Sequence, residues 1–527
     1  MSNRLKAKLR KIEKMGKSEL LGVIDVGASA IRLVIAEKKE KKDYIILESL
    51  SQPNRLGTDT FLDGKISAES AWATVKILKK FKRALKDYKV TQFRLVATSA
   101  VREAANRDYF IDYIYQNTGL KIQVIEGEEE CQFIFLSIRN KMLDANIDIS
   151  EPSLLLDLGT GTARIIFIKD GKMLFTQSLK LGSLRLREIL QDIDVQSSEF
   201  HKVLRAFIQA DIELIRKVSP FPKISRFIVT GVAMGDILQV LEPDLLQKNV
   251  TKVETNWFYN ILDSFKSTSQ EQFIEKFNVS VDKADVLVPT IIIYRHFIEI
   301  FNPDEIVIPK SSLAEGVILN EFAPLENFDE HIIASAIEYA KKFGCEESHA
   351  QHVMLLCESI FTQTRSLHGL DKSYLIILKA AALLHDIGHY VNDQAHHKHT
   401  QYLIYASSII GLTTSQLAQI AVIARNHRRY DVSIPLWQFP ELASADKNVL
   451  TKLIAILRIA NALDRSHTRR VSSLKIKLDK DHHQVIFKVR INKSIPLEKW
   501  AFKHNMELFS KIFYVDCILR EERILNE

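Results

Sequence analysis

The stretch GVIDVGASAIRLVIAE, residues 22–37, has a counterpart in LLLDLGTGTARIIFIKDG, residues 154–171. Each copy has the pattern of a strand, a turn of small residues, and a second strand rich in Val, Ile and Phe. Two copies in one register predict a duplicated α/β fold with a cleft between its lobes. The alternative is two unrelated hairpins with turn glycines. The alignment superposes Asp25, Gly27 and Arg32 on Asp157, Gly159 and Arg164.

The two turns have the composition of anion-binding loops. Glycine allows backbone N–H groups to approach a bound anion closely, and a concavity of such groups can hold a phosphate. An aspartate at the end of the first strand can face a cation that is bound to that phosphate. The repeat therefore indicates a cleft for a phosphorylated ligand.

The overall composition is that of an ordinary soluble globular protein. The chain has 527 residues, of which 46% are hydrophobic and 26% charged, and this length suggests roughly three or four domains. Intrinsic disorder, collagen and a disulfide scaffold are excluded. The cysteines have no CxxC spacing, which argues against a zinc ribbon and favours a reducing cytoplasm. They are Cys131, Cys345, Cys357 and Cys517.

Charge and hydropathy limit the partners. No apolar run approaches the roughly 20 residues of a membrane helix, so we expect no membrane partner. The net charge is +7 and the pI about 8.9, which favours anionic partners without choosing among them. The basic residues 1–20 lack the apolar core of a secretory signal. They are expected to form a solvated helix or an anion contact.

Composition shifts along the chain predict four parts. Strands and helices alternate in the first two parts, helices replace strands after about residue 325, and alternating apolar residues return near the C-terminus. We therefore expect an all-helical domain followed by a small α+β tail. The predicted boundaries are 1–150, 151–322, 323–470 and 471–527.

The segment VATSAVREAANRDYF, residues 96–110, is a strand that leads through small residues into a helix. Thr98, Ser99 and the first N–H groups of that helix can bind an anion. Arg102 can then clamp the anion through its guanidinium group.

The segment VIEGEEECQFIFLSI, residues 124–138, places three glutamates in the first turn of a helix. Such acidic residues often only oppose the helix dipole. The functional alternative is a general base, because hydrolysis of a phosphoanhydride needs a carboxylate that positions and deprotonates water.

The helical region carries an H…HD…D pattern. An adjacent imidazole and carboxylate, with a distant His and Asp, can bind a divalent cation and leave positions open for water. For any single member the alternative is a buried structural histidine. The set is His349, His385, Asp386 and Asp464, and His399 and His427 could complete a second metal position.

Together these segments resemble the Ppx/GppA family of exopolyphosphatases and guanosine pentaphosphate phosphohydrolases. The resemblance implies actin-like, that is duplicated ribonuclease H-like, lobes. It rests on segments that occur in family order, each weak alone: IDVG, RLG (55–57), ATSAVR (97–102), GEEE (127–130), LDLGTG (156–161), LKLGSLRL (179–186), ADVLVP (284–289) and LAEGVIL (313–319).

The resemblance implies Mg²⁺-dependent hydrolysis of the terminal phosphoanhydride of polyphosphate or of the 5′-γ phosphate of pppGpp. By position, Glu129 matches the water-activating glutamate and Asp157 the metal-associated aspartate. The residues that match the phosphate contacts are Asp25, Gly27, Arg102, Gly159 and Gly161. The family also implies a cytoplasmic homodimer, with no specific nucleic acid partner.

The chain departs from the family pattern in its phosphate loops. Ala28 and Ala30 stand where the family's first loop has polar side chains, and Arg164 replaces an acidic residue of the second. The loss of one charge-assisted phosphate contact weakens binding by roughly 1.5–3 kcal/mol. Two alternatives stay open, an active hydrolase with an altered cleft and a regulator that binds polyphosphate or guanosine phosphates without turnover.

The helical region resembles the HD phosphohydrolase superfamily through AALLHDIGH (381–389) and LRIANALDRSH (457–467). Every expected HD ligand is present, so the HD centre could itself be a metal-dependent phosphohydrolase. Its histidine-rich ligand set suits Mn²⁺, Fe²⁺ or Zn²⁺ better than Mg²⁺.

Overall fold

The computed structural model divides into two compact units, residues 1–326 (the first unit) and residues 327–527 (the second unit). This division is coarser than the four parts expected from the sequence, and the finer boundaries stay a prediction. The basic N-terminal stretch lies almost entirely outside the described residues. The structure describes residues 19–523 except 40–43, 190–197, 222, 242, 267–273, 276–280, 325–327, 408, 429–431, 433, 435, 445 and 480.

The first sheet of the first unit has helices on both faces. Its order is β3-β2-β1-β4-β5, with β1, β2 and β3 antiparallel and β4 and β5 parallel to β1. Ile24 and Val26 of β1 face α3 and α5, whereas Leu21 and Val23 face α6 and α13. The elements are β1 (Leu20–Val26), β2 (Ala30–Lys38), β3 (Tyr44–Pro53), β4 (Gln92–Ala97), β5 (Gln123–Val124), α3 (Ala68–Asp87), α5 (Arg107–Thr118), α6 (Gly127–Asp144) and α13 (Leu313–Phe322).

The second sheet repeats this arrangement, as the duplicated sequence predicts. Its order is β10-β11-β9-β6-β7-β8, in which β6, β7 and β8 are antiparallel and β9 is parallel to β6. Alternate residues of β6, Leu154, Leu156 and Leu158, pack with α8 and α12. The elements are β6 (Ser153–Leu158), β7 (Ala163–Lys169), β8 (Lys172–Leu179), β9 (Arg226–Thr230), β10 (Val250–Val253), β11 (Glu305–Pro309), α8 (Ser198–Val218) and α12 (Val281–Phe301).

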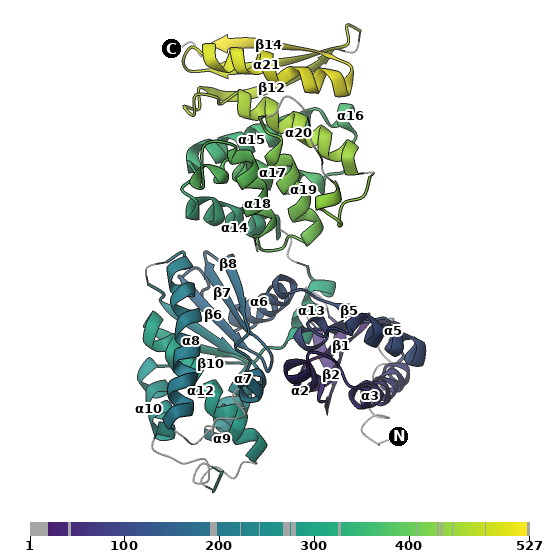
Figure 1. The fold of residues 1–527 in the computed structure, drawn as a ribbon, viewed down its shortest axis with the longest axis vertical. Coiled ribbons are helices and arrows are strands. Elements are labelled where there is room, and N and C mark those ends of the chain that lie inside the picture. The colour runs from purple at the N-terminus through teal and green to yellow at the C-terminus, as the bar shows by residue number, and fades with distance from the viewer. Residues whose placement is uncertain are drawn as a thin grey trace. The chain divides into compact units, whose positions relative to one another are not determined.

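Helix α6 lies between the two sheets (Figure 1). Phe133 and Leu136 of this helix belong to the core on the first sheet. At its N-terminus, a Cβ added to Gly127 would lie 2.9 Å from Oγ of Ser178 in β8. The glutamates of GEEE therefore begin a helix that meets both sheets. Shorter elements of the unit are α2 (Leu56–Asp63), α4 (Ser99–Arg102), α7 (Ser183–Ile189), α9 (Val232–Leu241), η2 (Pro243–Gln247) and α10 (Thr255–Lys266).

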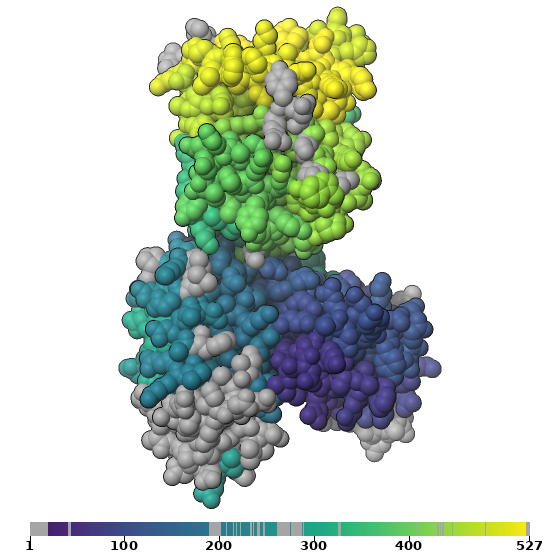
Figure 2. Space-filling model, viewed as in Figure 1, coloured from purple at the N-terminus to yellow at the C-terminus, as the bar shows by residue number. Residues whose placement is uncertain are grey.

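The second unit combines a helical bundle with a small sheet of order β12-β13-β14. Phe487 of the sheet and Leu453 of a bundle helix belong to one buried core, so the C-terminal residues, yellow in Figure 2, share the interior of the green helices. The elements are α14 (Phe328–Lys342), α15 (Glu347–Gln363), α16 (Arg365–His368), α17 (Tyr374–Leu384), η3 (Ile387–Tyr390), α18 (His396–Tyr405), α19 (Thr414–Arg425), η4 (Leu436–Gln438), α20 (Asp446–Ala462), β12 (Val471–Asp479), β13 (Gln484–Ile491), α21 (Pro496–Phe513) and β14 (Asp516–Arg523).

Two further properties bear on the sequence expectations. Among the described residues, no helix has the length and apolar character needed to cross a bilayer. The four cysteines are all free thiols.

Candidate functional site

The two Asp–Gly turns line one cavity of about 270 Å³ in the first unit. Asp25 lies opposite Arg32 in the β1–β2 ladder, and Asp157 lies opposite Arg164 in the β6–β7 ladder. The turns close in the same way, because the Gly27 N–H donates to the Ala30 carbonyl at 3.1 Å and the Gly159 N–H to the Thr162 carbonyl at 3.0 Å. The structure thus brings together both halves of the repeat.

Gly161 allows the second turn to pack closely against the first lobe. A Cβ at this position would lie 2.5 Å from the Phe61 ring and 2.6 Å from Ser99 Oγ, so a side chain here forces the neighbours apart. The Gly161 carbonyl accepts a hydrogen bond from Arg185 Nε at 2.7 Å. Thr98 and Ser99, which the sequence assigned to anion binding, also line the cavity.

Arg164 ties the cavity to helix α6. Its Nη1 donates to Asp157 Oδ2 at 2.7 Å, and its Nη2 donates to the fully buried Glu130 carboxylate. Arg102 donates through Nη1 to Glu130 Oε1 at 2.5 Å and to the Ile125 carbonyl at 2.6 Å. Arg102, assigned to phosphate by sequence, therefore holds Glu130 in this structure.

Glu130, and not its neighbour Glu129, reaches this network. Glu129 is half-buried, and its pKa is raised by burial and then by the charge of Glu126, while Arg94 opposes the shift. Glu130 lies one turn before Ile134, which lines the cavity, and residues four apart share a helix face. Because only the structure shows that Ile134 lines the cavity, the sequence itself carries no signal that singles out Glu130. The role assigned to Glu129 stays a prediction.

The carboxylates of the cavity fit a divalent cation. Asp25 Oδ1 is buried and accepts no hydrogen bond within the described part of the chain. Burial and then the charge of Asp25 raise the pKa of Asp157 to about 7. Two buried carboxylates, Asp25 and Asp157, provide the oxygen ligands that Mg²⁺ prefers.

Sequence reasoning missed the cationic side chains at the mouth of the cavity. Lys248 and Lys310 are exposed and line it, as does Ser311, whose hydroxyl lies 2.8 Å from Thr230 Oγ1. Lys248 lies between η2 and β10, and Lys310 directly follows β11. Neither lysine belongs to a motif, so only the fold could have identified them.

A second cluster of polar groups lies within the helices of the second unit. His349 comes from α15, His385 and Asp386 follow α17, and Asp464 follows α20. His349 Nδ1 lies 2.8 Å from Asp464 Oδ2, and Asp464 Oδ1 accepts the Arg469 N–H at 2.7 Å. The structure therefore brings together the whole H…HD…D set. Asp464 orients His349 and uses both of its oxygens within the protein.

Four imidazoles of this cluster carry their proton on Nδ1. His385, His396 and His427 each donate from Nδ1 to the carbonyl of the residue three positions earlier, at 2.8, 3.1 and 2.7 Å, and His349 donates to Asp464. Since carbonyl and carboxylate oxygens only accept, each neutral ring keeps a lone pair on Nε2. Burial lowers the pKa of His385 to about 3 and that of His396 to about 4, so both rings are neutral at pH 7.

These lone pairs converge on one carboxylate. Nε2 of His385 and of His427 lie 3.4 and 3.3 Å from Asp386 oxygens. The Nε2 atoms of His396 and His427 are 3.4 Å apart. Acceptor atoms at such distances repel one another unless a cation or a proton lies between them. Histidines that bind a metal usually donate their other ring N–H group to a carbonyl or carboxylate oxygen, as these rings do through Nδ1.

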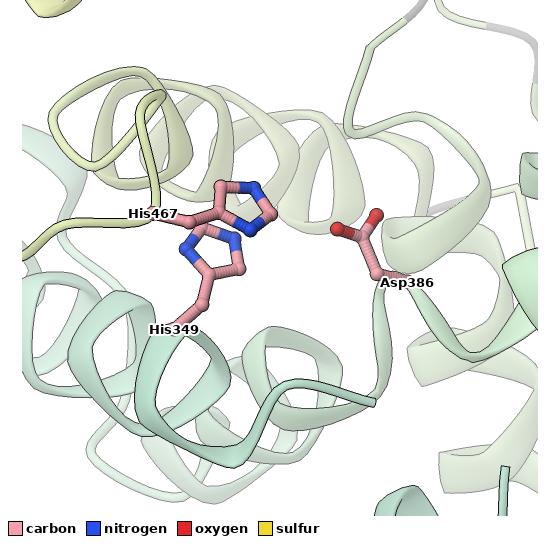
Figure 3. A group of neighbouring side chains, drawn as sticks. All are labelled: His349, Asp386 and His467. Carbon is pink, nitrogen blue, oxygen red and sulfur yellow. The ribbon is translucent and has the colours of Figure 1, made fainter. Parts of the chain in front are cut away.

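Two groups of described residues have ligand atoms within 4.8 Å of one another, and both contain Asp386. One joins Asp386 to His349 and His467, whose rings stack with centroids 3.6 Å apart while the Asp386 carboxylate faces them (Figure 3). The other joins Asp386 to His389 and His396. Sequence reasoning missed His467, although it lies in the LRIANALDRSH motif, and proposed His399 where the structure has His396.

Comparison with known sequences identifies related proteins along most of the chain. The profile of the Ppx/GppA phosphatase family matches residues 34–324, and that of Ppx/GppA phosphatase domain III matches residues 333–506. A guanosine-5′-triphosphate,3′-diphosphate pyrophosphatase of Pseudoalteromonas atlantica is 22% identical over 93% of this chain and 96% of its own. A protein of the same name from Aliivibrio fischeri is 22% identical over 86% of this chain and 88% of its own.

Solved structures share the fold of part of the chain. An exopolyphosphatase from Cytophaga hutchinsonii has a TM-score of 0.52 at 20% identity and covers 58% of this chain and 99% of its own. A Ppx/GppA family member from Aquifex aeolicus has a TM-score of 0.50 at 23% identity, with 58% of this chain and 97% of its own covered.

Proposed function

The chain belongs to the Ppx/GppA phosphatase family, and we propose that it hydrolyses terminal phosphoanhydride bonds in the cavity of the first unit. The substrate is inorganic polyphosphate or pppGpp, as the names of its relatives suggest. The observation that carries the proposal is the buried Glu130, which Arg102 holds and which Arg164 links to Asp157 of the cavity.

The side chains of the cavity suit a terminal phosphate. The two Asp–Gly turns line the cavity, and Lys248 and Lys310 supply positive charge at its mouth. Asp25 and Asp157 would hold Mg²⁺, which when bound neutralises the charge of the phosphates. These contacts keep the phosphoryl group close to helix α6.

We propose that Glu130, which is bonded to the cavity-lining Arg164, is the carboxylate that orients water. Each of its oxygens accepts a hydrogen bond from an arginine and keeps a further lone pair for a water molecule. The water oxygen bonds to the terminal phosphorus, the bridging P–O bond breaks, and orthophosphate and a shortened chain result.

The test is phosphate release from polyphosphate and from pppGpp, measured separately for the wild type, Glu130→Gln and Glu129→Gln. We expect Glu130→Gln to lose activity. Unchanged release from both substrates in Glu130→Gln would move the chemistry out of this cavity. If neither substrate is turned over but either binds, the cavity is that of a regulator, the second of the two alternatives.

The histidine cluster supports a second candidate function, an HD-type metal centre. The repulsive placement of the Nε2 lone pairs of His396 and His427 favours it. We propose that Mn²⁺, Fe²⁺ or Zn²⁺ binds here, with Asp386 shared between two metal positions. Elemental analysis of protein purified without chelator tests this.

The remaining proposals concern organisation. We propose that the boundaries near residues 150, 322 and 470 separate lobes I and II, the helical domain and the α+β tail. A cytoplasmic homodimer follows from the family resemblance alone. Light scattering of the purified full chain tests the oligomeric state.

A further inference from the structure

A second, larger cavity lies in the second unit between α20 and α21. Its volume is about 830 Å³, which lies in the range of small-molecule pockets. His427 lines it, and this residue also lies 3.3 Å from Asp386 at the centre of the histidine cluster. Arg428, another lining residue, has Nη2 4.0 Å from Asp386. One end of the cavity therefore adjoins the candidate metal centre through His427 and Arg428.

The walls next to that end are basic. Arg428, Arg458 and Arg465 line the cavity, and Lys511 joins them from α21. Arg458 is held in place, because its Nε donates to the Asn426 carbonyl at 2.8 Å. Glu507 is the one acid among the described lining residues. Three guanidinium groups in the wall of one cavity can bind a ligand that has several phosphate oxygens.

The wall formed by α21 carries exposed aromatic side chains. Trp500 is 57% exposed and Tyr514 is 87% exposed, although both line the cavity. The His504 ring lies on the same helix face, with its centroid 4.4 Å from that of Trp500. Large exposed rings beside a basic wall are the combination on which nucleic acid bases stack.

We propose that this cavity binds a nucleotide, with its base on Trp500 or Tyr514 and its phosphates directed along the arginines to the histidine cluster. The inference rests on the metal centre proposed above and assigns it a substrate class. Hydrolysis there forms a bond from a water oxygen to the terminal phosphorus and breaks the bridging P–O bond. One water proton goes to the leaving oxygen, and the products are orthophosphate and the shortened nucleotide.

The first experiment measures the base contact without metal. Calorimetry in EDTA compares GTP with inorganic triphosphate, which has the phosphates and no base. We expect Trp500→Ala to weaken GTP binding about tenfold or more while triphosphate binding changes less than about twofold. Trp437→Ala, which removes an 83% exposed tryptophan that does not line the cavity, is the matched control. Equal GTP affinity in the two variants overturns the proposal.

The second experiment tests the position of the phosphates. The full chain is loaded with Mn²⁺, freed of excess metal and mixed with GTP, and ³¹P resonances are recorded. Selective broadening of the terminal phosphate that disappears in Arg465→Ala supports the proposal. Bound Mn²⁺ without such broadening overturns it. A chain that takes up no Mn²⁺ refutes the metal centre itself and with it the hydrolytic step, whereas the Trp500 measurement still decides the nucleotide pocket.

Discussion

The cavity of the first unit and the histidine cluster of the second differ in the source of their positive charge. In the cavity, Arg164 lies between Asp157 and Glu130, and Arg32 lies 3.7 Å from Asp25. In the cluster, imidazole lone pairs and the Asp386 carboxylate face one another. In the cavity, arginine side chains balance the negative charge of the carboxylates. In the cluster, a bound metal ion would have to do so.

The comparison shows that the charged side chains of a site can differ while the backbone that carries them keeps its geometry. The Asp–Gly turns keep their register and hydrogen bonds, so the framework of the cavity is intact. Arg164, however, places a positive charge between Asp157 and Glu130. We therefore expect strict metal dependence in the second unit and weaker dependence in the first.

The largest expected effect is the loss of metal from the second unit in Asp386→Asn. Both groups of candidate ligands contain Asp386, so replacing its carboxylate should weaken metal binding at both. The loss of metal affinity should exceed the 10–100-fold that is typical of residues that only orient a ligand. Elemental analysis after Mn²⁺ loading measures the change. Asp371→Asn, at an exposed loop position, is the matched control. Equal metal content in both variants would show that the cluster is a set of structural histidines.

The next largest effect concerns the base of the first unit. Glu130→Gln keeps the shape of the side chain and removes its charge, so phosphate release should fall by about 10²-fold or more. Glu129→Gln should retain most activity, because Arg102 and Arg164 bind Glu130 rather than Glu129. Initial rates on polyphosphate decide between them. The opposite ranking would restore the assignment of Glu129 made from sequence.

Arg164→Ala tests whether the arginine replaces a metal. It leaves the buried Asp157 and Glu130 carboxylates without their partner, which should lower the free energy of unfolding by about 3–5 kcal/mol. Added Mg²⁺ should then raise the melting temperature of the variant more than that of the wild type. Differential scanning fluorimetry with and without Mg²⁺ measures both effects.

The repeat provides the control for that experiment. Arg32 has the same register as Arg164, but its side chain is 29% exposed and 3.7 Å from Asp25. Arg32→Ala should therefore change the free energy of unfolding by only about 0–1 kcal/mol. Similar losses in both variants, with no response to Mg²⁺ in either, would contradict the metal-replacement interpretation.

The sequence predicted the framework of both sites because its signals were local. The strand–Asp–Gly–strand pattern needs only a few consecutive residues, and the structure has both hairpins in the aligned register. The second unit is helical from α14 to α20 and ends in a small sheet with one helix, as the change in composition after about residue 325 predicts.

What the sequence missed depends on contacts between distant segments. Glu129 and Glu130 differ by about 100° of helix rotation, and the packing of α6 decides that Glu130 is the one that pairs with Arg164. His467 joins the cluster because its ring stacks on His349, which is far away in sequence. Neither relation is encoded in spacing alone.

The smallest expected effect belongs to the exposed lysines at the mouth of the cavity. Lys310→Ala removes one solvent-exposed positive charge at the mouth of the cavity. An exposed ion pair between such a charge and the substrate contributes about 0.2–1 kcal/mol to binding. The KM for polyphosphate should therefore rise only a few-fold, with kcat unchanged. Because exposed charges are screened, the difference should shrink as ionic strength rises from about 0.01 to 1 M. Lys223→Ala, on an exposed lysine paired with Asp304, serves as the control. A change in kcat, or a difference that persists at high salt, would place Lys310 among the groups that act on the transition state.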